Sequence, residues 1–586
     1  MPYDFGPLID AAGIRFRLWA PSQPHVELLL PDRPPIAMQR SDSGFREIHV
    51  DGVGAGTRYR FRANGQDVPD PASRLQDGDV GGWSVVWPGF GRPPRPAALR
   101  PWHETVLCEV HVGTASPEDT FSGLAERLEH FRDAGYTALE LMPIGDFPGQ
   151  RGWGYDGVLP FAPDAAYGTP EALRALVERA HELGLGMILD VVYNHFGKVG
   201  NAIPDYAPEW FAADAETPWG PGIDFRHAAV RRFYCENAQW WLGEYDFDGL
   251  RFDSVHEMRT EARDLFLGEL ARACRAVKPD AALVVENVRN QMHWLTRTGD
   301  ARPVDFTAQW NDDFHHVLQF LVTDERINGY EDTARDAVAD FEKSLRDGFV
   351  HDGDAAGASD GRTRGEPASL LPMQAFVSFL HNHDQIGNRP DGARIVERVD
   401  AERLDFAHFV LLLSPQIPLF FMGEEAHLRC PFLFFFDLPE PVRSELRDNR
   451  YWQMENVFHT KVLPGSLPDP QDKATFERSR LAWDDYGQEQ HRAALARFRE
   501  LVELRRDLVW PLASTRCLEA RSARQGDGVI VTWQYEAGTY TMLLNPTGDT
   551  AMMQVQLNQP VASTGRLEFH DGRIKAGPWS AMVWRS

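Results

Sequence analysis

Cysteine is scarce in this chain of 586 residues: there are five, and no two of them form a CxxC pair. An odd number of scattered cysteines argues against a disulfide framework and against a structural zinc site. The cysteine content therefore predicts a protein of a reducing compartment.

Long apolar runs are absent as well. The longest candidate, Phe409 to Met422, is interrupted by two prolines and two polar residues, and it is shorter than the roughly 18 residues that a membrane span needs. The first residues, MPYDFGPLIDAAG, lack the basic segment of a signal peptide and contain two aspartates. These features predict a soluble, cytoplasmic protein.

Positive charge is in short supply. Lys and Arg number 60 against 86 Asp and Glu, a formal net charge of -26, so a phosphate backbone or an anionic membrane is repelled on average. We expect a neutral partner, neither nucleic acid nor membrane. Aromatic residues, in contrast, reach 11% with 17 tryptophans, and flat rings in a cleft suit the faces of sugars.

The two ends of the chain show the period-two pattern of β-strands. Ile14, Phe16 and Leu18 alternate with polar residues near the start, and the alternation returns after about residue 510. We predict an immunoglobulin-like or carbohydrate-binding-like β-sandwich over residues 1–90 and a C-terminal β-sandwich over 509–586. A proline-rich stretch, Trp87 to Pro101, reads as a linker.

The middle of the chain, residues 102–508, alternates buried strands with helices. The strand candidates are Thr105 to His111, Ala138 to Pro143, Met187 to Tyr193, Gly249 to Ser254, Ala282 to Glu286, Asp305 to Trp310, Phe376 to His381 and Pro418 to Met422. Eight such strands predict an α/β fold, the (β/α)8 TIM barrel, with insertions near residues 196–230 and 347–367.

Catalytic groups of TIM barrels lie at the C-terminal ends of the strands. There the chain carries Asp253, Glu286 and Asp384, which we expect to converge on one cleft. Two of them suit a retaining glycosidase, in which one carboxylate attacks the sugar and a protonated one donates to the leaving oxygen. Arg251 is expected to keep Asp253 ionised, and crowding by the other carboxyls to raise the pKa of Glu286.

These residues also have plainer interpretations. A single aspartate at a strand end is often a helix cap or an ion-pair partner, but four polar segments on successive strands are hard to explain that way. His381-x-His383 has the spacing of a metal pair without a third ligand, and Asp352 to Asp354 lacks the further acids of a calcium loop. No metal and no cofactor are predicted.

At these strand ends the chain resembles the α-amylase superfamily. The segments DVVYNH, GLRFDSVH, VVENV and FLHNHDQ are similar, in order, to its four signature regions. The flanking β-domains are those of a subgroup with branching enzymes, isoamylases and maltooligosyltrehalose trehalohydrolases. The segments that begin at Gly152, Thr217, Asp312, His383 and Pro431 look most like the trehalohydrolases; a branching enzyme is expected to have WGYQ instead of WGYD.

The resemblance implies roles for particular residues. Asp253 would be the nucleophile, Glu286 the acid/base and Asp384 the transition-state stabiliser, with Tyr155 as a stacking platform beneath the cleaved sugar. Further substrate-binding residues implied are His195, Arg251, Phe252, Ser254, Val255, His256, Asp312, Asp313, Phe314, His315, His316, His383, Gln385, Ile386, Gly387 and Asn388. Asn194 matches a calcium ligand of some amylases, but no acidic ligands accompany it.

The expected activity is retaining hydrolysis of the α-1,4 bond that joins trehalose to the malto-oligosaccharide of maltooligosyltrehalose, an oligosaccharide substrate. Specificity for the trehalose end is expected from the segment Asp312 to His316. Two alternatives stay open: a branching transferase, and a non-catalytic glucan-binding protein on an amylase barrel. The oligomeric state and the preferred chain length are not predicted.

Overall fold

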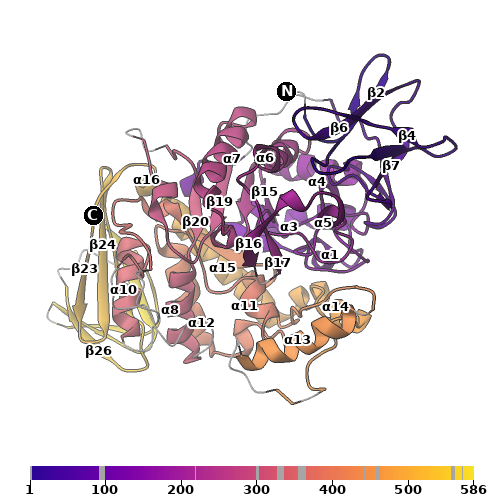
Figure 1. Ribbon diagram of the computed structural model, residues 1–586. Helices are drawn as coiled ribbons and strands as arrows, with labels where there is room; N and C mark the ends of the chain where they lie inside the picture. The colour runs from indigo at the N-terminus through magenta and orange to yellow at the C-terminus, as the bar shows by residue number, and fades with distance from the viewer. Residues whose placement is uncertain are drawn as a thin grey trace.

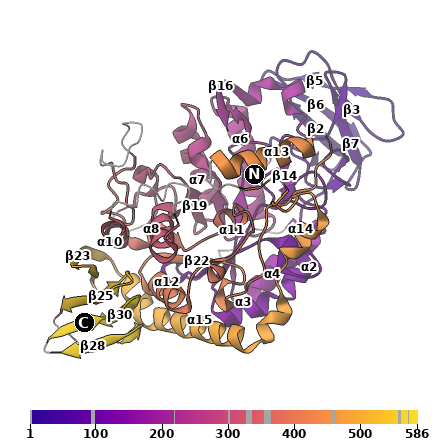
Figure 2. The same cartoon turned by 90° about the horizontal axis from the view of Figure 1, so that it is seen from below.

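The computed structural model describes residues 3–91, 99–217, 219–298, 302–325, 336–353, 364–440, 442–456, 462–463, 465–555, 561–570 and 572–586. Parts of two predicted loops lie outside these residues: 92–98 of the proline-rich linker and 354–363 of the second insertion. Strand-rich segments from the two ends of the chain lie on opposite sides of a central α/β body (Figures 1 and 2).

The central body is a closed barrel of eight parallel strands, so the predicted TIM barrel is confirmed. All eight predicted strands are present, in the predicted order. They are β11 (Leu107–Val110), β12 (Ala138–Leu141), β15 (Gly186–Val191), β18 (Gly249–Phe252), β19 (Ala282–Glu286), β20 (Ala308–Trp310), β21 (Phe376–Phe379) and β22 (Ile417–Phe421). Nearly every residue in them is buried, because helices cover the outside of the barrel and side chains fill its interior.

Capping residues mark the start of a covering helix. In α4 (Pro170–Glu182) the Thr169 hydroxyl caps Ala172 N, Pro170 occupies the first turn, and Leu173, Leu176 and Val177 face the barrel. The other long helices are α6 (Ala228–Gly243), α7 (Arg263–Val277), α8 (Asp312–Thr323), α10 (Ala337–Asp347), α12 (Ala401–Leu413), α13 (Val442–Asn456) and α15 (Glu489–Leu508).

The N-terminal segment forms two antiparallel sheets. One has the order β1-β2-β6-β5 and the other β4-β3-β7-β10-β9, with β8 beside β7. The short strands are β1 (Leu8–Ile9), β4 (Ile36–Ala37), β5 (Gln39–Arg40), β8 (Gln66–Val68), β9 (Gln76–Asp77) and β10 (Trp83–Val85). The longer strands are β2 (Gly13–Trp19), β3 (Val26–Leu29), β6 (Phe45–Asp51) and β7 (Arg58–Ala63). Glu236 of α6 accepts hydrogen bonds from the backbone N–H of Asp4 and Phe5 (2.7 and 3.0 Å), which ties the first residues to the barrel.

The C-terminal segment also forms two sheets, of order β23-β24-β25-β30-β27 and β26-β29-β28. The shorter strands are β26 (Ala551–Gln554), β27 (Ala562–Thr564), β28 (Leu567–His570) and β29 (Arg573–Ala576). The longest strands are β23 (Cys517–Gln525), β24 (Gly528–Tyr535), β25 (Gly538–Asn545) and β30 (Ser580–Arg585). Trp533 Nε1 and Tyr540 Oη donate to the carbonyls of Leu345 and Leu413 on barrel helices. The predicted limits of three domains, 1–90, 102–508 and 509–586, stay a prediction.

The first insertion holds a hairpin, β16 (Phe211–Thr217) and β17 (Gly220–Ile223), whose turn carries Trp219. Within the described part of the chain, no helix is long and apolar enough to cross a membrane. In that same part, no group of three or more His, Cys, Asp or Glu side chains is arranged to hold a metal ion.

Candidate active site

The site is built around one fully buried cation, Arg251, at the C-terminal end of β18. Its Nη1 contacts Asp190 Oδ2 at 2.6 Å and Asp253 Oδ1 at 2.9 Å, and its Nη2 contacts Glu286 Oε2 at 2.7 Å. The guanidinium lies 4.0 Å from the ring centroid of Trp310 on β20. One guanidinium therefore joins carboxyls from strands β15, β18 and β19.

The turn after β18 aims two of these groups. Ser254 has a left-handed backbone (φ 40°), which costs about 1–2 kcal/mol for a residue with a Cβ. In this conformation its N–H donates to Glu286 Oε2 at 2.9 Å. Asn194, just after β15, donates to Asp253 Oδ2 at 2.7 Å. The turn thus stores strain to place the Asp253 and Glu286 carboxyls on either side of Arg251.

The protonation of the pair differs from the sequence expectation. Burial by itself raises the pKa of Glu286, but Arg251, His256 and the Ser254 N–H outweigh burial and lower it. For Asp253, burial and the carboxylates of Glu286 and Asp190 raise the pKa, and Arg251 offsets them only in part. Two expectations were therefore wrong: crowding does not raise the pKa of Glu286, and Arg251 does not keep the pKa of Asp253 low. The reason is that Glu286 accepts hydrogen bonds from more donors than Asp253 does.

The third carboxyl, Asp384, lies on the short helix α11 (His383–Gly387). Asn382 and Gln385 form a capping box at its start. The His383 ring and backbone N–H both donate to Glu109 of β11. Burial by itself lowers the pKa of His383, but Glu109 and Asp384 outweigh it and raise it to about 9. His383 is thus a cation at neutral pH, 3.4 Å from Asp384, whose side chain is 45% exposed.

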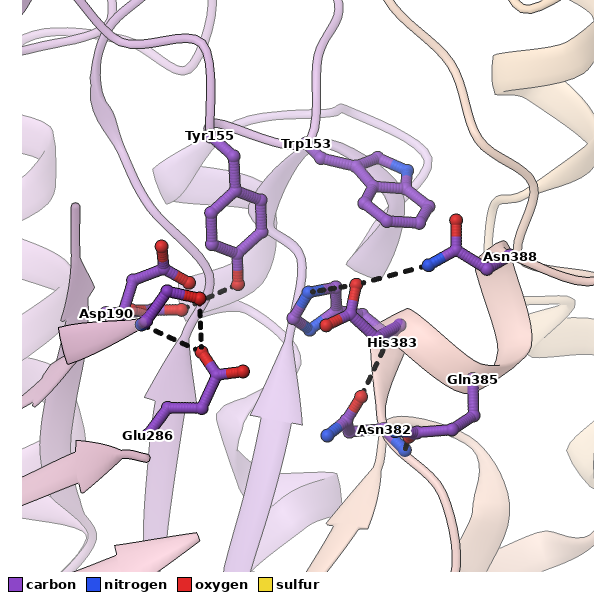
Figure 3. Close-up of polar contacts among 12 residues, drawn as sticks. Trp153, Tyr155, Asp190, Glu286, Asn382, His383, Gln385 and Asn388 are labelled. Atoms are coloured by element: carbon purple, nitrogen blue, oxygen red, sulfur yellow. Dashed lines mark hydrogen bonds and ion pairs between the residues drawn. The ribbon is translucent and has the colours of Figure 1, made fainter. Parts of the chain in front are cut away.

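Two aromatic rings stack on histidines of the site. Tyr155 stacks on His383 (centroids 5.0 Å apart, 21° between planes) and donates its hydroxyl to Asp190 Oδ2 at 2.6 Å. Figure 3 shows the Tyr155 hydroxyl pointing to Asp190, with Trp153 and His383 beside it. Trp219, 39% exposed, stacks on His195 (4.8 Å, 16°). Burial lowers the pKa of His195 to about 4, so this ring is neutral.

Several predicted substrate-binding side chains are buried. Phe252, Val255, Phe314, His315 and Ile386 are almost fully buried, because they belong to the core of the strands and helices that carry the site. A buried side chain of this kind supports the cleft but presents no surface to a sugar.

Two more predicted residues act within α11. Gln385 Oε1 accepts the Asn382 N–H at 2.8 Å as part of the helix cap. Gly387 lies against Trp153, and a Cβ there would stand 2.1 Å from ring atom Cζ2. Asn388, just after the helix, contacts Asp384 through its Nδ2 at 3.4 Å.

The aspartates at the start of α8 differ from each other. Asp313 accepts four hydrogen bonds within the protein, from Asn290, Val350 N, His351 N and Arg364. Burial, reinforced by Glu286, raises the pKa of Asp312 to about 8, and its Oδ2 has no hydrogen-bond partner among the residues that the structure describes. The geometry favours Asp312 over Asp313 as a group that meets substrate.

Four residues that contact predicted site residues are not among the predicted set: Glu109, Asp190, Trp310 and Arg450. Glu109 had a signal, since it is a lone acid within the buried run of β11. Asp190 belongs to the segment DVVYNH and Trp310 ends a predicted strand. Arg450 of α13 hydrogen-bonds Asn388 and Gly387, but no signal in the sequence pointed to it.

Fold and site together define the class: this protein is a glycoside hydrolase of the α-amylase superfamily. Residues 73–206 match the family model described as alpha amylase, catalytic domain. The solved structure described as a putative alpha amylase from Salmonella typhimurium has a TM-score of 0.93 to this chain at 36% identity, and covers 100% of both chains.

The chain belongs to the malto-oligosyltrehalose trehalohydrolase family. It is 34% identical to the malto-oligosyltrehalose trehalohydrolase of Saccharolobus solfataricus, over 93% of this chain and 94% of that protein. It is 36% identical to that of Deinococcus radiodurans, over 97% and 93%. The 1,4-alpha-glucan branching enzyme GlgB of Nocardia farcinica is 31% identical over only 48% of this chain.

Proposed function

We propose that the protein hydrolyses the α-1,4 bond between trehalose and the malto-oligosaccharide chain of malto-oligosyltrehalose, with retention of configuration. The observation that carries the mechanism is the bridge that Arg251 makes between Asp253 and Glu286. Retaining glycosidases need their two carboxyls about 5 to 5.5 Å apart, and inverting ones need more room for a water. Two carboxyls held by the two Nη atoms of one guanidinium suit the closer spacing.

The reaction has two steps. Asp253 attacks the anomeric carbon while Glu286 gives its proton to the glycosidic oxygen, so that trehalose leaves and a glycosyl-Asp253 ester remains. Water then attacks the same carbon, Glu286 takes the proton of this water, and the freed malto-oligosaccharide restores the Asp253 carboxylate. Atoms and protons balance over the cycle.

General acid catalysis needs Glu286 protonated, whereas Arg251 and the Ser254 N–H donate hydrogen bonds to its carboxylate and lower its pKa. We infer that a sugar bound over Asp253 excludes water and shifts Arg251 toward Asp253. The proton that Asp253 and Glu286 share then moves to Glu286.

The remaining charges suit an uncharged glucan and its transition state. The positive charge that develops on the reacting sugar lies among Asp253, Glu286 and Asp384. Burial and Glu286 raise the pKa of Asp384, and His383, held by Glu109, offsets them and favours the charged carboxylate beside the reacting ring. On the leaving-group side, we infer that Asp312 hydrogen-bonds the trehalose unit, since its Oδ2 has no partner within the described part of the chain.

Replacement of Glu286 by Gln tests the catalytic proposal. We expect a loss of about 10²- to 10⁴-fold in kcat, the share that acid/base catalysis supplies. Glu182→Gln, an exposed glutamate of α4, is the matched control and should change nothing. Unchanged hydrolysis in Glu286→Gln would show that the assigned acid/base is wrong. A wild-type protein that binds the glucan without any turnover would indicate a glucan-binding protein.

The substrate is tested by parallel incubation with malto-oligosyltrehalose and maltopentaose. We expect free trehalose from the first and much slower cleavage of the second. The appearance of branched glucan in place of trehalose would support the transferase alternative and contradict the proposed hydrolysis.

A further inference from the structure

One side chain of α13 reaches the catalytic end of the barrel from outside it. This helix is polar along most of its length, and only Arg450 and Met454 among its described side chains are buried. Arg450 is 6% exposed, and its guanidinium lies 5.0 Å from the ring centroid of Phe434. A buried arginine on an otherwise solvated helix indicates a specific partner rather than a solubility role.

The partners of Arg450 are the last residues of the catalytic helix α11. Nη1 donates to Asn388 Oδ1 and Nη2 donates to the Gly387 carbonyl, both at 2.8 Å. The two bonds leave from adjacent nitrogens of one planar group, which makes the contact geometrically demanding. Arg450 thereby fixes both the end of α11 and the orientation of the Asn388 amide.

The orientation of that amide matters because its two ends differ chemically. Arginine only donates hydrogen bonds, so it must contact the Asn388 oxygen and not the nitrogen. The amide nitrogen is then directed to Asp384 Oδ1, at 3.4 Å. This oxygen also lies 3.4 Å from His383 Nε2. The Asp384 carboxylate therefore has two donors: the His383 ring, which Glu109 orients, and the Asn388 amide, which Arg450 orients.

We propose that Arg450 is a positioning residue for the reaction: through the Asn388 amide it holds the Asp384 carboxylate in the orientation that stabilises the transition state. This inference rests on the role proposed above for Asp384. It implies that loss of Arg450 lowers the rate of the chemical step more than it weakens substrate binding, because the misplaced group acts in the transition state.

The first test compares arginines of the same helix. In Arg450→Ala we expect kcat to fall about tenfold or more, which corresponds to about 1.4 kcal/mol of transition-state stabilisation, with KM changed much less. Arg447→Ala removes an exposed arginine of the same helix and should leave both constants unchanged. Arg450→Lys keeps the charge but not the paired bonds, so it should also lose kcat even if Arg450→Ala folds poorly.

A double-mutant cycle shows whether Arg450 acts through Asn388. If it does, Arg450→Lys should cost much less in an Asn388→Ala background than in the wild type, because the link is already broken. Equal losses in both backgrounds, or a loss confined to KM, would overturn the proposal. Guanidinium added to Arg450→Ala should restore part of kcat, and no recovery with a fully folded variant would count against it.

Failure of this inference is distinguishable from failure of the proposed function. A wild-type protein that releases no trehalose contradicts the proposed substrate, and the Arg450 comparison can then be made on any α-glucan that the protein does cleave. A wild-type protein that releases trehalose, with kcat unchanged in Arg450→Lys, contradicts the positioning role alone.

Discussion

The two aspartates at the start of α8 offer a sharp test of how the site is built, because they are neighbours in sequence with different surroundings. Asp313 is fully buried and accepts hydrogen bonds from four donors, two of them backbone N–H groups of Val350 and His351. Its carboxylate thus joins α8 to the segment after α10 and to Arg364. We expect Asp313→Asn to loosen this junction, and Asp312→Asn to leave it intact.

The magnitude follows from the contacts. Removal of one partner from a buried, hydrogen-bonded ion pair costs about 3–5 kcal/mol. The four bonds share one carboxylate and are not additive, so we expect about 3–5 kcal/mol for Asp313→Ala. An asparagine keeps one acceptor but turns an NH2 group toward a donor, so Asp313→Asn should lose a large part of the same free energy.

The effect of pH has a definite sign. Burial by itself raises the pKa of Asp313, but Arg364 and the neighbouring hydrogen bonds outweigh it and lower the pKa. The stabilisation is therefore present above the ordinary aspartate pKa, near 4, and is lost as the pH falls through the lower folded value. Wild type and Asp313→Asn should converge in stability in acid.

The assay combines a global and a local measurement. The chain has several structural parts and is not expected to unfold in one step, so the unfolding midpoint is paired with amide hydrogen exchange at Val350 and His351. Both should change in Asp313→Asn, whereas Asp312→Asn should instead lower the preference for malto-oligosyltrehalose over maltopentaose. An Asp313→Asn variant with unchanged exchange and an altered substrate preference would refute this reasoning.

Two further variants test the surroundings of α11. Glu109→Gln should lower the pKa of His383 from about 9, so the alkaline limb of kcat/KM should move to lower pH, and an unmoved limb would contradict the pairing. Gly387→Ala forces a Cβ to 2.1 Å from Trp153, and such overpacking costs about 1–3 kcal/mol. The unfolding midpoint of this variant should therefore fall. Gly548→Ala, at an open position, should have the midpoint of the wild type.

The barrel could be predicted from the sequence because its signals are local. Each strand is a short apolar run, each helix has its own periodicity, and the alternation of the two specifies the topology. Since the C-terminal ends of parallel strands meet at one face, the convergence of Asp253 and Glu286 followed from their places at strand ends. The resemblance to the α-amylase superfamily rested on the same segments.

What only the tertiary structure decided is which groups share a partner. Arg251 was expected to pair with Asp253, two residues away. It contacts both Asp253 (2.9 Å) and Glu286 on the next strand (2.7 Å), and the contact with Glu286 is the shorter one. Asp313 was expected in the cleft and lies in a closed hydrogen-bonded junction. Arg450 reaches Asn388 across 62 residues of chain.

The physical reason is that hydrogen bonds and ion pairs depend on distances of a fraction of an ångström and on competition among neighbours. Apolar periodicity specifies the face on which a side chain lies, but it does not specify which of several carboxyls a guanidinium contacts. By itself, the sequence determined the barrel and the residue types at its mouth. The packing of distant segments decided which carboxyl holds the charge, and which residue holds Asp384 in place.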